Sequence, residues 1–255
     1  MEVLLNNYIE KNEIQKLASE LKRGNEQKLI TGLSGGAKPV FLKALQTSIE
    51  KPILIVEPNL YQAQRIYENL VKMLGEAYVH LYPAEELVAA EFSVSSYELR
   101  AQRIETIDHM VREGKGIYIT PIAGMRRLLP NKARWMKNSL VAKLNETIDI
   151  DLWTKKLIAM NYIRQEMVTT PGEFALRGGI LDLYPPHLEN PIRIELFDTD
   201  IDSIRTFSAE DQRSLEKLET VSILPASEFV WSLEDLLTIA ERLEEELAVS
   251  LQKVK

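Results

Sequence analysis

A glycine-rich stretch near the N-terminus has several residue types of a phosphate-binding loop. Such loops follow Gly-x-x-x-x-Gly-Lys-[Ser/Thr]: the glycines let backbone N–H groups surround the phosphates, the lysine reaches the terminal phosphates, and the hydroxyl binds Mg²⁺. The corresponding residues here are Gly32, Gly35, Gly36, Ala37, Lys38 and Pro39. Ala37 adds a Cβ at the tight turn, and Pro39 removes both the hydroxyl and a backbone donor. We interpret the stretch as a degenerate phosphate loop that binds no nucleotide tightly.

Other interpretations of this stretch stay open. One is an ATP-binding, helicase-like enzyme domain that uses Lys38, and another is an ordinary strand–helix turn. Residues 32–36 also fit Gly-x-Ser-x-Gly, the turn that presents a hydrolase nucleophile, which would here be Ser34. A hydrolase would also need a histidine and an acid, and His187 is only a loose candidate for the histidine.

A second group of residues suits protein recognition. In the apolar run 192–197, alternation places Ile192, Ile194 and Leu196 on a core face and Arg193, Glu195 and Phe197 on the opposite face. An arginine beside an aromatic is typical of protein-binding surfaces. The alternative is a second packing layer, in which a helix covers Phe197 and Arg193 pairs with Glu195 or Asp198. Arg177 precedes Gly178 and Gly179, which fits either a contact site or a bulge.

Composition excludes several classes of site. The chain has 255 residues and no cysteine, so it has no disulfide, thiolate metal site or cysteine nucleophile. Its three histidines lack the spacing of metal ligands, and we expect no metal site. No apolar run approaches the ~18 residues of a membrane helix, and the N-terminus lacks a basic leader. We therefore expect a cytoplasmic protein with no membrane contact.

The net charge of −7 disfavours nonspecific binding to nucleic acid. One stretch, residues 114–145, is nevertheless basic and has no acidic residue. Its basic residues are Lys115, Arg126, Arg127, Lys132, Arg134, Lys137 and Lys143. A solvated basic face is the simpler interpretation, and the alternative is a contact surface for an acidic partner or for a phosphate backbone, as in a DNA-binding module.

The first half of the chain predicts alternating helices and strands. Helical spacing covers residues 14–21, 40–48, 60–74 and 98–112, and apolar runs predict strands at 28–31, 52–58 and 116–121. The β-branched run 52–58 is typical of a strand buried on both faces of a parallel sheet. We expect an α/β fold here and assign residues 1–137 to a degenerate P-loop, helicase-like domain.

After residue 137 the pattern changes to closely spaced strands. They are predicted at 174–177, 180–184, 192–197 and 201–207, behind a helix at 152–160. We assign residues 138–225 to an inserted antiparallel α+β domain. Ser232 opens a match to a capping box before a helix that runs to about Val254. Residues 226–255 are interpreted as the start of a further helicase-like segment that is cut short.

Several of these segments resemble the N-terminal, UvrB-like module of the bacterial transcription-repair coupling factors (Mfd). The similarity lies in residues 31–35, 60–64, 172–185, 193–198, 201–205 and 224–229. The block Phe-x-x-Arg-Gly-Gly-Ile-Leu-Asp, residues 174–182, is shared mainly with these factors and with the excision-repair helicase UvrB.

The resemblance implies a helicase-like domain with a degenerate loop and an inserted domain that docks UvrA. By this resemblance Arg177, Arg193 and Phe197 match positions that contact UvrA. The chain is then a non-catalytic recruitment module of transcription-coupled nucleotide excision repair and has no cofactor of its own. ATP and Mg²⁺ would belong to the motor of the parent protein, which would meet RNA polymerase and DNA through its other parts.

Overall fold

The computed structural model describes residues 12–24, 27–49, 51–84, 97–230 and 233–254, and it divides into two compact units, residues 1–128 and 129–255. Each unit is described by itself. None of the described helices is long and apolar enough to cross a membrane. The subdivision of the chain at residues 137 and 225 stays a prediction.

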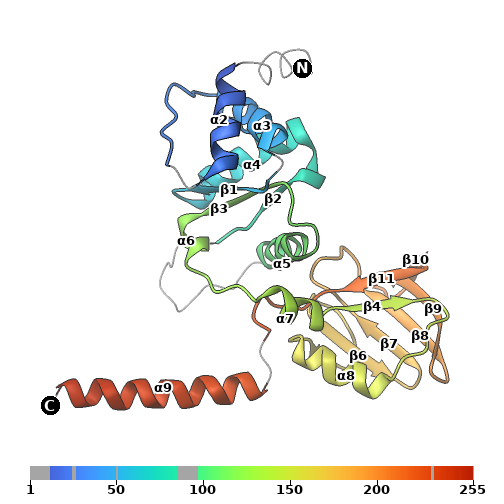
Figure 1. Ribbon diagram of the computed structural model, residues 1–255. Coiled ribbons are helices and arrows are strands. Elements are labelled where there is room, and N and C mark those ends of the chain that lie inside the picture. The colour runs from blue at the N-terminus through green and yellow to red at the C-terminus, as the bar shows by residue number, and fades with distance from the viewer. Residues whose placement is uncertain (1–11, 25–26, 50, 85–96, 231–232, 255) are drawn as a thin grey trace. The chain divides into compact units, whose positions relative to one another are not determined.

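The first unit contains a three-stranded parallel sheet with strand order β1-β3-β2 (Figure 1). Its strands are β1 (Ile53–Glu57), β2 (Val79–Leu81) and β3 (Ile117–Pro121). Strand β3 is buried along its whole length because it is central and covered on both faces. The predicted parallel α/β arrangement is therefore confirmed for this unit.

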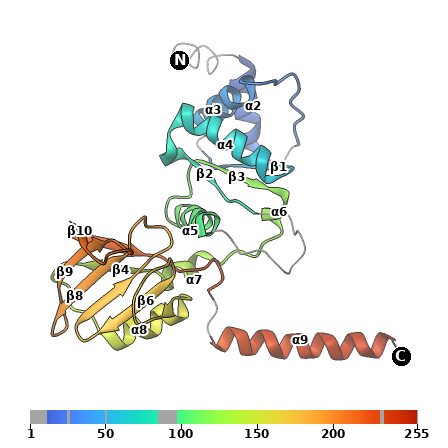
Figure 2. The same ribbon diagram turned by 180° about the vertical axis from the view of Figure 1, so that it is seen from behind.

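Helices flank this sheet on both sides (Figure 2). They are α2 (Asn12–Arg23), α3 (Ala37–Ile49), α4 (Leu60–Leu74) and α5 (Tyr97–Arg112), with the short elements η1 (Glu76–Tyr78) and α6 (Ile122–Met125). Helix α4 packs Ala63, Ile66 and Leu70 against the sheet. On the side of α5, the Thr106 hydroxyl donates to the Leu81 carbonyl at 2.7 Å.

Two of the strand predictions in this unit are wrong. Residues 28–31 form no strand, and the Leu29 side chain there is 90% exposed because no neighbouring strand pairs with this segment. The run 52–58 forms β1 but is not buried on both faces. Leu54 and Val56 are 52% and 44% exposed, because β1 is an edge strand with its cover on one face only.

The second unit is built on a six-stranded sheet of order β10-β9-β8-β7-β6-β5. Its strands are β5 (Ile163–Arg164), β6 (Glu173–Arg177), β7 (Ile180–Leu183), β8 (Ile192–Phe197), β9 (Asp200–Phe207) and β10 (Ser214–Leu218). All neighbours pair antiparallel except β5 and β6. The predicted antiparallel α+β material is confirmed, while β5 and β10 were not predicted.

The described residues of this unit also form a further pair of strands and three helices. They are the antiparallel pair β4 (Leu140–Lys143) and β11 (Thr220–Ile223), with α7 (Lys132–Lys137), α8 (Ile150–Ala159) and α9 (Leu233–Val254). Helix α8 begins at the N-cap Asp149 and packs Trp153 and Leu157 against one face of the six-stranded sheet (Figure 1). The predicted cap Ser232 of α9 lies outside the described residues.

Candidate protein-binding face

Strands β6, β7 and β8 form one continuous antiparallel ladder. Register pairs Arg177 with Ile180 and Ile180 with Glu195, so the C-terminal ends of β6 and β8 lie at the same end of the sheet. One face of the ladder packs into the core with α8, through residues such as Leu181 and Ile194. Arg177 and Phe197, twenty residues apart in sequence, are therefore brought to one sheet end.

Phe197 is 79% exposed, an unusual position for a phenylalanine that ends an otherwise well-buried strand. It precedes the β8–β9 turn, where Asp198 has φ +57°. The turn is held by hydrogen bonds from the Thr147 hydroxyl to Asp200 (2.6 Å) and from the Ile148 amide to the Thr199 carbonyl (2.8 Å). A fixed turn presents the ring to solvent, and no helix in the part of the chain that the structure describes covers Phe197, contrary to the packing alternative.

Arg193 lies on the face opposite the core, but its side chain is only 15% exposed. Its Nε and Nη2 donate to the two carboxylate oxygens of Asp182 at 2.6 and 2.8 Å, and the guanidinium stacks over the Phe207 ring at 4.6 Å. The hydrogen bonds with Asp182 raise the pKa of Arg193. Arg193 thus pairs with Asp182, neither with Glu195 nor with Asp198 as the packing alternative supposed.

Arg177 is the more accessible of the two arginines, with a side chain that is 50% exposed. Its Nη2 donates to Asp182 Oδ2 at 2.6 Å. The following residues form the β6–β7 turn, in which Gly178 has φ +60°. A Cβ on Gly179 would lie 2.9 Å from the Leu196 carbonyl oxygen. The two glycines therefore let the turn pack directly against the end of β8.

Glu195 belongs to a separate cluster on the same face. Its carboxylate accepts hydrogen bonds from the Ser203 hydroxyl (2.8 Å) and from Arg205. The Ser203 hydrogen bond and the charge of Arg205 lower the pKa of Glu195. On this face, both carboxylates, Asp182 and Glu195, thus form ion pairs with arginines of the same sheet.

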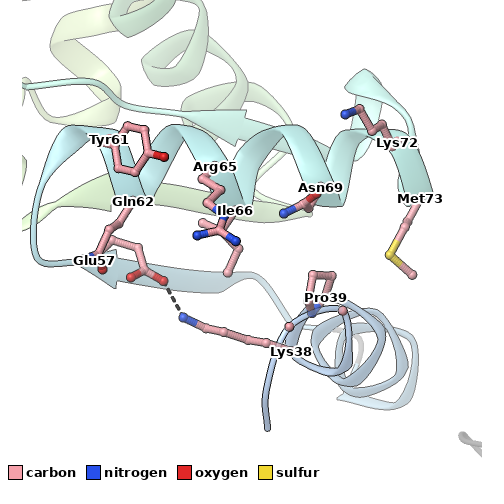
Figure 3. A pocket seen from close by; sticks show the side chains of 12 residues that line it. Lys38, Pro39, Glu57, Tyr61, Gln62, Arg65, Ile66, Asn69, Lys72 and Met73 are labelled. Atoms are coloured by element: carbon pink, nitrogen blue, oxygen red, sulfur yellow. Dashed lines mark hydrogen bonds and ion pairs between the residues drawn. The ribbon is translucent and has the colours of Figure 1, made fainter.

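The glycine-rich loop of the first unit also reaches a cavity, of about 770 Å³. Gly32 and Gly35 have φ +83° and +53°, and α3 begins directly after Gly36. Lys38 extends to Glu57 at the end of β1, with Nζ 2.5 Å from Oε1, and Arg65 of α4 also lines the cavity (Figure 3). The charge of the loop lysine is thus neutralised by a carboxylate that is largely buried.

No strand precedes this loop in residues 27–34. The turn that presents a hydrolase nucleophile needs a strand before it, so the local structure gives Ser34 no support as a nucleophile. Within the described residues, no group of three or more histidines, aspartates or glutamates could hold a metal ion.

The second unit is similar to a known protein family. Residues 140–229 match the family described as the UvrB interaction domain. This region runs from the first residue of β4 to just beyond β11 and contains Arg177, Arg193 and Phe197. This part of the chain is thus similar to a UvrB interaction domain.

Similarity to longer proteins covers nearly the whole chain. It is 40% identical over 246 residues to the transcription-repair-coupling factor of Bacillus subtilis strain 168, covering 96% of the chain and 21% of that protein. The corresponding factor of Staphylococcus epidermidis RP62A is 37% identical over 231 residues, covering 90% and 20%. That of Staphylococcus aureus RF122 is 35% identical over 232 residues, covering 91% and 19%. The chain is thus similar to part of the transcription-repair-coupling factors and spans about a fifth of the length of these relatives.

Sequence reasoning missed three residues that organise the face. Asp182 joins the two arginines, Phe207 stacks on Arg193, and Gln212 accepts from Arg193 Nη2 at 3.4 Å. A lone carboxylate within the apolar run Ile180–Leu183 is the one signal that pointed to Asp182, because a buried charge requires partners.

Proposed function

We propose that this chain is a non-catalytic recruitment module of transcription-coupled nucleotide excision repair that binds UvrA through the second unit. The UvrB interaction domain and the relatedness to transcription-repair-coupling factors support this role. Binding to RNA polymerase and DNA, and the use of ATP and Mg²⁺, are assigned in this proposal to other parts of a longer parent. A cytoplasmic location belongs to the same proposal.

The observation that carries the proposal is the exposed Phe197 at the same sheet end as the half-exposed Arg177. Binding hot spots combine an aromatic side chain that fills a partner's pocket with arginines that make charge-assisted hydrogen bonds. Phe197 is already solvated and held on a fixed turn, so covering it would remove a large apolar surface from water with little loss of backbone freedom. Arg193, whose side chain is less exposed, would be the third residue that contacts UvrA.

We also propose that residues 32–39 are a degenerate phosphate loop of a helicase-like unit. Lys38 pairs with Glu57 instead of standing free for a phosphate, and Pro39 is buried at the start of α3. Proline supplies neither the hydroxyl that would bind Mg²⁺ nor a backbone donor. These features favour a binding module over an ATP-using enzyme.

Calorimetric titration with purified UvrA tests the proposal. We expect saturable binding by the parent chain, a loss of about 30-fold in affinity for Phe197→Ala and about 10-fold for Arg177→Ala. Matched controls are Leu215→Ala, an exposed apolar residue on β10, and Arg213→Ala, whose side chain is 85% exposed. Both controls are expected to bind like the parent.

Two results would contradict this function. A parent chain that shows no saturable binding to UvrA would remove it, and a Phe197→Ala variant as tight as the parent would remove the assigned face. A separate titration with duplex DNA at two salt concentrations tests the DNA-binding alternative, because binding of DNA through the basic residues 114–145 would weaken steeply with salt.

A further inference from the structure

Asp182 occupies the middle of the face that carries the arginines. It lies on β7 between β6 and β8, directly opposite Arg193, and it is 1% exposed. Its carboxylate accepts three hydrogen bonds of 2.6 to 2.8 Å from two guanidinium groups. A buried carboxylate is stable only when paired, so the two arginines and Asp182 form one unit.

The two arginines use Asp182 differently. Arg193 makes a two-point contact through Nε and Nη2, whereas Arg177 makes a single contact through Nη2. A guanidinium has five N–H donors, so Arg177 keeps four beyond the bond to Asp182. Because its side chain is half exposed, part of this donor set faces solvent and can meet a partner while Nη2 is held by Asp182.

Asp182 is itself held in place through Arg193. The Arg193 guanidinium lies against the Phe207 ring and donates to Gln212 Oε1. Gln212, with φ +61°, donates in turn from Nε2 to the Val168 carbonyl at 3.2 Å. These contacts leave the Arg193–Asp182 pair little freedom to move. The carboxylate that accepts the hydrogen bond from Arg177 is therefore fixed in position.

We propose that Asp182 is a positioning residue of the binding face: it fixes the guanidinium of Arg177 in the direction that meets the partner. The inference rests on the proposed function, because the partner is UvrA. A free arginine side chain loses much rotamer freedom when a partner immobilises it, and a tethered one loses less. Asp182 touches no partner in this account and acts only through the arginines.

A double-mutant cycle tests the proposal on the whole chain. Asp182→Asn keeps the size of the side chain and one acceptor oxygen but removes the charge. We expect it to weaken UvrA binding about 5- to 10-fold in the parent background, and by only about 2- to 3-fold when Arg177 is already alanine, because the part of the effect that passes through Arg193 remains. In the Phe197→Ala background the loss should again be about 5- to 10-fold. A merely structural role would instead give the same loss in all three backgrounds.

A second measurement needs no UvrA. In the free chain, the guanidinium ¹⁵N resonances of Arg177 should show restricted rotation that Asp182→Asn releases, while those of Arg213 stay unchanged. If the parent chain fails to bind UvrA, the proposed function falls and the resonances still decide whether Asp182 restrains Arg177. Equal losses of affinity in all backgrounds, or unchanged Arg177 resonances, would overturn the positioning role.

Discussion

Arg193 and Asp182 face each other directly across β8 and β7, joined by two hydrogen bonds of 2.6 and 2.8 Å. The carboxylate is 1% exposed and the arginine side chain 15% exposed, so water screens this pair far less than a surface ion pair. Arg193, which we propose as a UvrA contact, is therefore also part of the framework of the sheet. We therefore expect substitutions at Arg193 to change folding stability as well as binding.

Arg193→Ala is expected to destabilise the second unit by about 2 to 3 kcal/mol, because Asp182 would lose two of its three hydrogen bonds while staying buried. Urea unfolding followed by tryptophan fluorescence measures this, since Trp135 and Trp153 are both buried in this unit. Arg213→Ala, which breaks only an exposed pair at 3.5 Å, should stay within about 0.5 kcal/mol of the parent. Equal midpoints for the two variants would contradict the structural role of Arg193.

Gly179→Ala is expected to cost about 1 to 3 kcal/mol, because the added Cβ would meet the Leu196 carbonyl oxygen at 2.9 Å and push the β6–β7 turn away from β8. The same shift should weaken UvrA binding by moving Arg177 relative to Phe197. Thermal unfolding and calorimetry measure the two effects. Gly178→Asn is the control, since asparagine tolerates the φ of +60° and no atom lies within 4 Å of a Cβ there. A Gly179→Ala variant as stable as this control would show that the contact relaxes freely.

Elements with strong local signals could be predicted from the sequence. Helix α4 forms at Leu60–Leu74, as its apolar spacing indicates, and its N-cap Asn59 accepts from the Gln62 amide at 2.9 Å. Strand β8 buries Ile192 and Ile194 as its alternation indicates, whereas the pairing of β8 with β9 has a register shift between Glu195 and Leu196. Local periodicity is sufficient where burial and secondary structure agree.

Features that depend on distant pairing were missed or wrong. Strand β4 exists because residues 220–223, some eighty positions later, pair with it. Residues 28–31 have a strand-like composition but no partner strand. The pairing of charges on the outer face was missed for the same reason. Alternation placed Arg193 on this face, but only the strand register shows that Asp182 lies opposite it. Pairing of this kind is a property of the folded sheet and not of any single segment.

Lys38→Ala is expected to leave the binding of a fluorescent ATP analogue unchanged, with no saturable binding below about 1 mM in either form. The reason is that Ala37 and Pro39 prevent the loop from enclosing phosphates even when the lysine is present. Glu57→Gln serves as the control, because it frees Lys38 from its ion pair while keeping a side chain of similar size. Micromolar binding that appears in Glu57→Gln and disappears with Lys38→Ala would contradict the degenerate loop.

The stability of the first unit should depend on pH through His80 and His109, whose rings stack with centroids 3.6 Å apart. Burial, together with the neighbouring imidazole of His109, lowers the pKa of His80 from 6.5 to about 4, and burial lowers the pKa of His109 as well. His109 Nδ1 lies 2.8 Å from the Tyr118 hydroxyl, and the buried Nε2 atom of His80 has no hydrogen-bond partner among the described residues. Protonation of either ring is therefore disfavoured in the folded state.

Both pKa values are lower in the folded than in the unfolded chain, so the unfolded chain takes up protons first as the pH falls. Stability should be constant above about pH 7 and decline from about pH 6.5 towards pH 4, by about 1 to 2 kcal/mol after allowance for the partial exposure of His80. Hydrogen exchange of the Ile117 and Ile119 amides, measured at about pH 7.5 and about pH 5.5, reports on the stability of this unit.

The variant His80→Phe is the control for this prediction. It keeps a ring in the stack but cannot be protonated, so it should remove most of the decline in stability. Burial raises the pKa of Glu105, which acts in the opposite direction in both proteins and cancels in the comparison. An equally steep decline in parent and variant would assign the pH dependence to other groups.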